Sequence, residues 1–129
     1  MQRVLIIGGC VRIGRSIARD ILNHTEAEVT ITGRNPQLGM AALEELGCQV
    51  QFQVLDLANQ QQLDEAITKA DLVVHSAGPF HHRDAKVLQT CIQQRVNYVD
   101  VSDERSFTRK AVAQRQAAAA AGVTAVINT

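Results

Sequence analysis

The chain has 129 residues, 46% of them hydrophobic and 20% charged, which suits one folded domain with its own core and excludes a disordered tail. Its 13 Lys and Arg residues balance 13 Asp and Glu residues, so binding to nucleic acid or to a membrane through a broad basic surface is not indicated. The three cysteines form no CxxC pair and no apolar run has the length of a signal-peptide core or a transmembrane helix, which favours a cytoplasmic protein without a metal site.

Short β-branched runs alternate with longer amphipathic segments along the chain, a pattern typical of strands alternating with helices. The run at 4–7 is typical of a buried strand, whereas the run at 50–55 alternates at period two and suits a sheet edge. Asn35 and Pro36 predict the start of the second helix, and Gly47 predicts its end. Strands are predicted at 4–7, 29–32, 50–55, 72–75, 98–101 and 123–127. Helices are predicted at about 13–22 and at 36–46, 59–69, 84–94 and 106–121.

Six strands alternating with five helices indicate βαβ units and therefore a parallel sheet. Right-handed crossovers and a glycine-rich loop after the first strand predict a doubly wound α/β domain of the Rossmann type, with helices on both faces. The expected strand order is 3-2-1-4-5-6. No linker or repeat divides the chain, so residues 1–129 are expected to form one domain.

A glycine-rich loop follows the first strand and opens the first helix, which is the context of a dinucleotide-binding fingerprint. Its residues are Gly8, Gly9, Cys10, Val11, Arg12, Ile13 and Gly14. Val11 occupies the place of the middle glycine, where a β-branched side chain would crowd the phosphates or force an unfavourable φ. The alternative interpretation is an ordinary tight turn between a strand and a helix.

The cofactor is predicted from the end of the second strand. A site for NAD would place Asp or Glu there to bind the ribose 2′-hydroxyl, but the sequence has Thr32, Gly33 and Arg34. A guanidinium at this position suits a 2′-phosphate, so NADP is favoured and NAD is the alternative. Arg34 could also be a solvated loop cation.

Two further loops follow strands at the same edge of the predicted sheet. Asp56 and Leu57 come after the third strand, where they would contact the adenine, although Asp56 could equally cap a helix. Ala77, Gly78 and Pro79 come after the fourth strand, where Gly78 permits close approach of the backbone to a cofactor.

The sequence resembles the saccharopine dehydrogenase family over nearly its whole length. The resemblance is carried by the glycine-rich loop followed by Arg15, the pair Gly33-Arg34, the segments at 54–56 and 77–80, and the segment at 98–100. It implies an NAD(P)-binding Rossmann domain whose groove is lined by residues already singled out: Gly8, Gly9, Gly14, Arg34, Asp56, Ala77, Gly78 and Pro79. Asp100 and Ser102 would then lie near the nicotinamide end.

The resemblance also implies an oxidoreductase in which a separate domain binds a small-molecule substrate and forms a homodimer. In the family the chain continues past the sixth strand, so we expect this chain to be an N-terminal domain that is inactive alone, with its catalytic residues elsewhere. The alternative is a non-catalytic module that senses a nucleotide or binds a protein.

Other kinds of site are poorly supported by the sequence. His81, His82 and Asp84 lack a second cluster of metal ligands, and His75 suits a strand-end histidine better than an acid or base. Cys10 is interpreted as a small loop residue rather than an activated thiol. The single tyrosine, Tyr98, is not followed by the Lys that a short-chain dehydrogenase requires, and no P-loop spacing is present.

Overall fold

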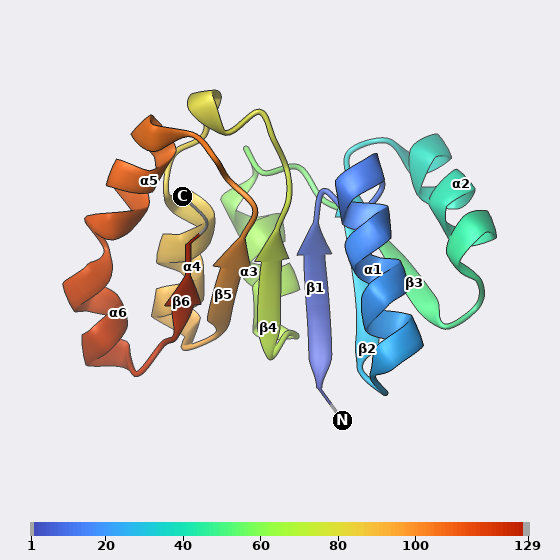
Figure 1. Ribbon diagram of the computed structural model, residues 1–129, viewed down its shortest axis with the longest axis horizontal. Coiled ribbons are helices and arrows are strands. Elements are labelled where there is room, and N and C mark those ends of the chain that lie inside the picture. The colour runs from blue at the N-terminus through green and yellow to red at the C-terminus, as the bar shows by residue number, and fades with distance from the viewer. Residues whose placement is uncertain (1, 128–129) are drawn as a thin grey trace.

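The computed structural model describes residues 2–127 as one six-stranded parallel sheet with helices on both faces (Figure 1). The strand order is β3-β2-β1-β4-β5-β6, which confirms the predicted doubly wound Rossmann topology and places β3 at an edge. The strands are β1 (Arg3–Ile7), β2 (Glu28–Gly33), β3 (Val50–Val54), β4 (Leu72–His75), β5 (Asn97–Asp100) and β6 (Ala125–Val126). The helices are α1 (Arg12–His24), α2 (Pro36–Leu46), α3 (Gln60–Thr68), α4 (Lys86–Gln94), α5 (Arg105–Val112), α6 (Arg115–Ala121) and the short 3₁₀ helix η1 (Phe80–His82).

The sheet separates two hydrophobic cores, because alternate side chains of each central strand point to opposite faces. In β1, Leu5 and Ile7 pack in the larger core, beneath α3, α4, α5 and α6. Val4 and Ile6 pack in the smaller core, beneath α1 and α2. β1 is therefore buried on both sides, as its run of apolar residues predicts.

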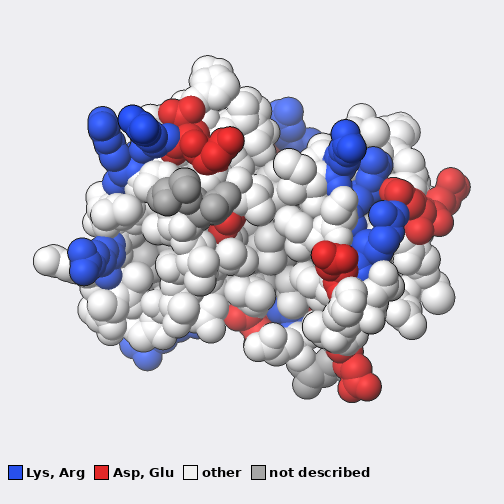
Figure 2. All heavy atoms as spheres, viewed as in Figure 1, with Lys and Arg blue, Asp and Glu red and all other residues white. Residues whose placement is uncertain are grey.

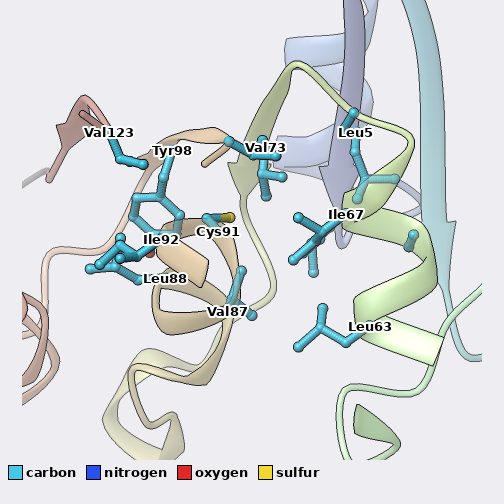
Figure 3. Close-up of a cluster of buried hydrophobic side chains, with 14 of the residues drawn as sticks. Leu5, Leu63, Ile67, Val73, Val87, Leu88, Cys91, Ile92, Tyr98 and Val123 are labelled. Carbon is cyan, nitrogen blue, oxygen red and sulfur yellow. The ribbon is translucent and has the colours of Figure 1, made fainter. Parts of the chain in front are cut away.

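The larger core fills the space between the sheet and the pair α3 and α4 (Figure 3). Leu63 and Ile67 reach it from α3, and Leu88 and Cys91 reach it from α4. Burial raises the pKa of the Cys91 thiol to about 12, so this cysteine behaves as a small apolar residue.

Asparagine side chains cap two helices where the sequence predicts helix starts. Asn35 Oδ1 accepts the N–H groups of Gln37 and Leu38 at 2.9 and 3.3 Å, ahead of α2. Asn59 Oδ1 accepts the N–H of Gln62 at 3.1 Å, ahead of α3. The predicted helix at 84–94 begins two residues later than expected, because Asp84 lies outside it and accepts the Lys86 N–H at 3.0 Å.

The prediction of one long helix at 106–121 is wrong. The structure has two helices there, α5 and α6, joined at Ala113 and Gln114. The chain tightens at the junction, where the Gln114 N–H bonds the carbonyl of Ala111, only three residues back, at 3.0 Å. The predicted strand at 123–127 is also shorter, since β6 comprises Ala125–Val126 alone.

The C-terminus of α4 has an arginine where glycine is usual. Arg95 has φ 59° and ψ 42°, and the following N–H, of Val96, bonds the Cys91 carbonyl at 2.9 Å. A left-handed backbone strains every residue with a Cβ, so we expect Arg95→Gly to raise the free energy of unfolding by about 0.5–1 kcal/mol. Urea unfolding at neutral pH measures the change. Arg95→Ala keeps the strain and should leave stability close to wild type, so an equal gain in both variants would contradict this explanation.

Candidate functional site

The predicted site residues gather at the carboxyl edge of the sheet, on either side of β1. The order of the strands reverses direction there, since the chain passes from β1 to β2 on one side and from β3 back to β4 on the other. The loop after β1, the end of β2 and the loop after β4 meet at this point. In open α/β sheets this is where a crevice for a ligand forms.

Glycines allow the loop after β1 to approach its neighbours closely. Gly8 has φ 81°, and a Cβ built on it would lie 2.9 Å from the backbone of Ala77 in the loop after β4. A Cβ on Gly14 would clash with the Gly8 carbonyl oxygen, so α1 packs directly on the loop that precedes it. These contacts join Gly8, Gly14 and Ala77 in one tightly packed unit.

The first turn of α1 offers backbone N–H groups with no acceptor among residues 2–127. Those groups belong to Arg12, Ile13 and Gly14, since the first intrahelical bond runs from the Arg15 N–H to the Val11 carbonyl at 2.8 Å. Side chains cap or approach the first turns of α2, α3, α4 and α5, but Val11 supplies no such acceptor to α1. The free donors and the positive end of the helix dipole together form a place for an anion.

Val11 does not have the strained backbone that its sequence position suggested. Its φ is −93° and its ψ is 170°, an extended conformation that β-branched residues adopt readily. Its side chain is 49% exposed. The positive φ of this loop falls on Gly8 instead, so the prediction of an unfavourable φ at Val11 is wrong.

Cys10 is buried against the end of β2. Its Sγ donates to the Thr32 carbonyl at 3.7 Å and lies close to Gly33. Burial raises the pKa of this thiol, and Arg15 lowers it by a smaller amount. The thiol is therefore held in its neutral form, and Cys10 acts as a small packing residue.

Basic side chains gather over the N-terminal end of α1 (Figure 2). Arg15 belongs to α1 and is engaged, since its Nε lies 3.0 Å from a carboxylate oxygen of Glu45 on α2. Arg12 and Arg34 are exposed and form no ion pair within the described part of the chain. Those two guanidinium groups are thus available to an anionic ligand beside the free N–H groups of α1.

Asp56 and Leu57 lie beyond the end of β3, next to the end of β2. The Leu55 N–H bonds the Gly33 carbonyl at 2.9 Å, which places the two strand ends together. Asp56 Oδ1 accepts the Ala58 N–H at 2.9 Å in a local turn, and Asn59 caps α3, so the alternative interpretation of Asp56 as a helix cap is wrong. The Leu57 carbonyl accepts Nζ of Lys86 at 3.0 Å, and its side chain packs on the larger core.

Hydrogen bonds hold the loop after β4 to β1 and to the side chains of His75 and Arg83. Ser76 donates both its N–H and its Oγ–H to the Ile7 carbonyl, at 2.9 and 2.7 Å. The Ala77 N–H approaches Nδ1 of His75 at 3.4 Å, and the Ala77 carbonyl accepts Nε of Arg83 at 3.0 Å. Gly78 and Pro79 follow and are exposed. The sequence gives no signal for Arg83, because its contact depends on how η1 folds back.

A buried polar group lies at the ends of β4 and β5. Asp100 is paired with His75 in the sheet register, and its carboxylate accepts the Tyr98 hydroxyl at 2.7 Å and the Ser102 N–H at 3.1 Å. Burial and the neighbouring Asp100 carboxylate raise the pKa of Tyr98. Tyr98 therefore stays protonated and donates to Asp100.

Two other kinds of feature are absent from residues 2–127. No group of three or more His, Cys, Asp or Glu side chains is arranged to hold a metal ion, and the ring centres of His81 and His82 lie 3.8 Å apart with the rings tilted by 50°. Within the same residues no helix is long and apolar enough to cross a membrane.

Comparison with known proteins gives relatives and a structural neighbour of the expected kind. A "Trans-acting enoyl reductase" of Mycobacterium ulcerans is 26% identical over 91 residues, which cover 68% of this chain and 22% of that protein. A human "Saccharopine dehydrogenase-like oxidoreductase" is 31% identical over 62 residues, 48% of this chain and 14% of that one. The chain spans about a quarter or less of these relatives' lengths.

The fold is that of solved dehydrogenase domains. Apo saccharopine dehydrogenase (L-Glu forming) from Saccharomyces cerevisiae superposes with a TM-score of 0.80 and 17% identity, covering 98% of this chain and 27% of that structure. The family model described as "Saccharopine dehydrogenase NADP binding domain" matches residues 4–126. The resemblance seen in the sequence is thereby confirmed, and the chain belongs to the family of saccharopine dehydrogenase NADP-binding domains.

Proposed function

We propose that this domain binds NADP(H) at the carboxyl edge of the sheet, against the loops after β1 and β4, and positions it for hydride transfer. The observation that carries the proposal is the uncapped first turn of α1, whose three free N–H groups follow a glycine-rich loop that packs closely on Gly14. Donors at a helix N-terminus suit a pyrophosphate, and the family to which the chain belongs is described as NADP-binding.

Each predicted site residue has a role in this proposal. The N–H groups of Arg12, Ile13 and Gly14 hold the pyrophosphate, while Gly8, Gly9, Cys10 and Val11 shape the loop beneath it. Arg34 binds the 2′-phosphate, since its guanidinium is exposed and without an ion pair in residues 2–127. Asp56 and Leu57 flank the adenine, and Ala77, Gly78 and Pro79 face the nicotinamide half.

The nicotinamide supplies the hydride chemistry when NADP(H) is bound, and the residues of this domain bind and orient it. We propose that a substrate domain beyond this chain supplies the small-molecule substrate and the catalytic acid or base, and that the whole protein is a cytoplasmic homodimer. The relatives' greater lengths support a further domain. The exposed apolar side chains of Val112 and Val126 are available for contact with it.

Titration with NADPH and NADH tests the cofactor assignment. We expect Arg34→Gln to weaken NADPH binding about tenfold or more and to leave NADH binding nearly unchanged, because only NADPH carries the 2′-phosphate. Arg109→Gln is the matched control, since Arg109 is an exposed arginine on α5. Fluorescence of the reduced nicotinamide measures both affinities.

Three results would contradict this proposal. If wild type binds neither NADPH nor NADH, the carboxyl edge of the sheet is not a dinucleotide site. If wild type binds NADH more tightly than NADPH, or if Arg34→Gln weakens both equally, Arg34 does not recognise the 2′-phosphate.

A further inference from the structure

The two peptide groups that flank Ala77 are each held by a side chain that no nucleotide-binding motif includes. Its N–H approaches Nδ1 of His75 at 3.4 Å, and its carbonyl accepts Nε of Arg83 at 3.0 Å. A residue in a surface loop normally has at least one of these backbone groups in water. Here both peptide planes that flank Ala77, Ser76–Ala77 and Ala77–Gly78, are fixed.

His75 is buried in the core, and only one of its ring nitrogens has a hydrogen-bond partner in residues 2–127. The residue is 1% exposed, and its ring lies 4.9 Å from the ring of Phe80, 6.0 Å from Phe107 and 6.3 Å from Tyr98. Since Nδ1 accepts from Ala77, the neutral ring carries its proton on Nε2, which has no hydrogen-bond partner in residues 2–127.

An unpartnered buried N–H is costly, and an apolar side chain in the same place would avoid that cost. Leucine or phenylalanine would suit the surrounding rings of Phe80 and Phe107 at least as well as histidine does. What an apolar side chain lacks is an acceptor for the Ala77 N–H. We therefore explain the histidine at this position by its contact with the loop and not by its packing in the core.

Arg83 is itself held in place from two directions. Its N–H bonds the Phe80 carbonyl at 3.0 Å, which closes η1, and its own carbonyl accepts Nζ of Lys110 on α5 at 3.0 Å. Phe80 anchors the segment, since its ring is buried 4.8 Å from the ring of Phe107. The guanidinium thus reaches back to Ala77 from a fixed base.

Building on the proposed function above, we propose that His75 and Arg83 are positioning residues for the cofactor. By fixing the two peptide groups that flank Ala77, they set the orientation in which Gly78 and Pro79 meet the nicotinamide half of NADP(H). They touch the loop and not the adenine half, which lies across β1, beside Arg34. Their loss should therefore weaken binding of the whole dinucleotide without weakening binding of its adenine half.

Two ligands separate these effects: NADPH, and adenosine 2′,5′-bisphosphate, which carries the adenine and the 2′-phosphate but no nicotinamide. His75→Leu removes the acceptor for the Ala77 N–H, whereas the smaller side chain of His75→Asn keeps an acceptor close to the place of Nδ1. Arg83→Met removes the donor to the Ala77 carbonyl and keeps the length of the side chain. Arg115→Met, at an exposed arginine at the start of α6, is the matched control.

We expect His75→Leu and Arg83→Met to weaken NADPH binding about five- to tenfold and to leave adenosine 2′,5′-bisphosphate binding within twofold of wild type. His75→Asn should restore most of the NADPH affinity, and Arg115→Met should change neither ligand. The emission of bound NADPH should also shift in the two disruptive variants, because the surroundings of the nicotinamide change.

Other outcomes would overturn the inference. If both ligands weaken together, the two residues support the fold as a whole and not the loop. If NADPH binding is unchanged, or if His75→Asn is no better than His75→Leu, the contacts with Ala77 do not position the cofactor. A wild-type protein that binds neither ligand would instead overturn the proposed function, and the inference with it, before any variant is compared.

Discussion

Replacing Gly8 with alanine is expected to lower the free energy of unfolding by about 3 kcal/mol, since two costs coincide at this residue. The backbone has φ 81°, a left-handed conformation that costs a residue with a Cβ about 1–2 kcal/mol. The new Cβ would also lie 2.9 Å from the Cα and N of Ala77, and backbone atoms cannot move aside as a flexible side chain can. Overpacking of this kind costs about 1–3 kcal/mol.

Substitutions at two further glycines separate the conformational cost from the steric cost. Gly122 has φ 71° with no atom within 4 Å of its would-be Cβ, so Gly122→Ala should show the conformational cost alone, about 1 kcal/mol. Gly14 has no positive φ but lies against the Gly8 carbonyl, so Gly14→Ala should show the steric cost alone. Urea unfolding of the three variants measures the differences. Equal losses for Gly8→Ala and Gly122→Ala would show that the close approach to Ala77 is unimportant.

Mild acid is expected to destabilise the domain through His75. Burial and, to a smaller extent, the charge of Arg83 lower the pKa of this histidine from 6.5 to about 3, while Asp84 partly opposes them. Between these two values the unfolded chain binds a proton that the folded chain does not, so stability falls as the pH falls. From pH 7.5 to pH 5 the contribution of His75 amounts to a loss of about 2 kcal/mol.

His75→Asn isolates this contribution, because it removes the titrating ring and keeps every other ionisable group. The variant should lose about 2 kcal/mol less stability than wild type between pH 7.5 and pH 5, measured by urea unfolding at each pH. The comparison uses the change with pH and not the absolute stability, so any cost of the smaller side chain cancels. Parallel pH profiles for the two proteins would show that His75 titrates normally in the folded state.

The order of the strands could be predicted from the sequence because each element carries a local signal. The apolar run of β1 and the period-two alternation of β3 distinguish a central strand from an edge strand, and Asn35 identifies a helix start by its side chain. The division between α5 and α6 carries no such signal. Neither glycine nor proline stands at Ala113 or Gln114, and the tightened turn depends on packing in three dimensions.

The candidate site, like the fold, could be predicted from the sequence only in part. The glycine-rich loop and Arg34 are recognisable because their roles follow from their place after a strand. The conformation of Val11 was not, because its φ depends on where the turn places its one positive φ, which is at Gly8. Arg83 could not be found at all, since it meets Ala77 only after η1 has folded back on Phe80 and Phe107.

Because the two cores differ in size, local stability differs between the two faces of the domain. The face with the smaller core carries α1, whose first turn supplies the free N–H groups, whereas the larger core holds the opposite face together. Local unfolding begins where the fewest buried contacts must be broken, so we expect α1 and α2 to detach before α3 and α4 do. An anion bound to α1 would oppose that detachment, because it binds only the folded helix. Unfolding of the whole domain should therefore become more cooperative as more of the protein binds ligand.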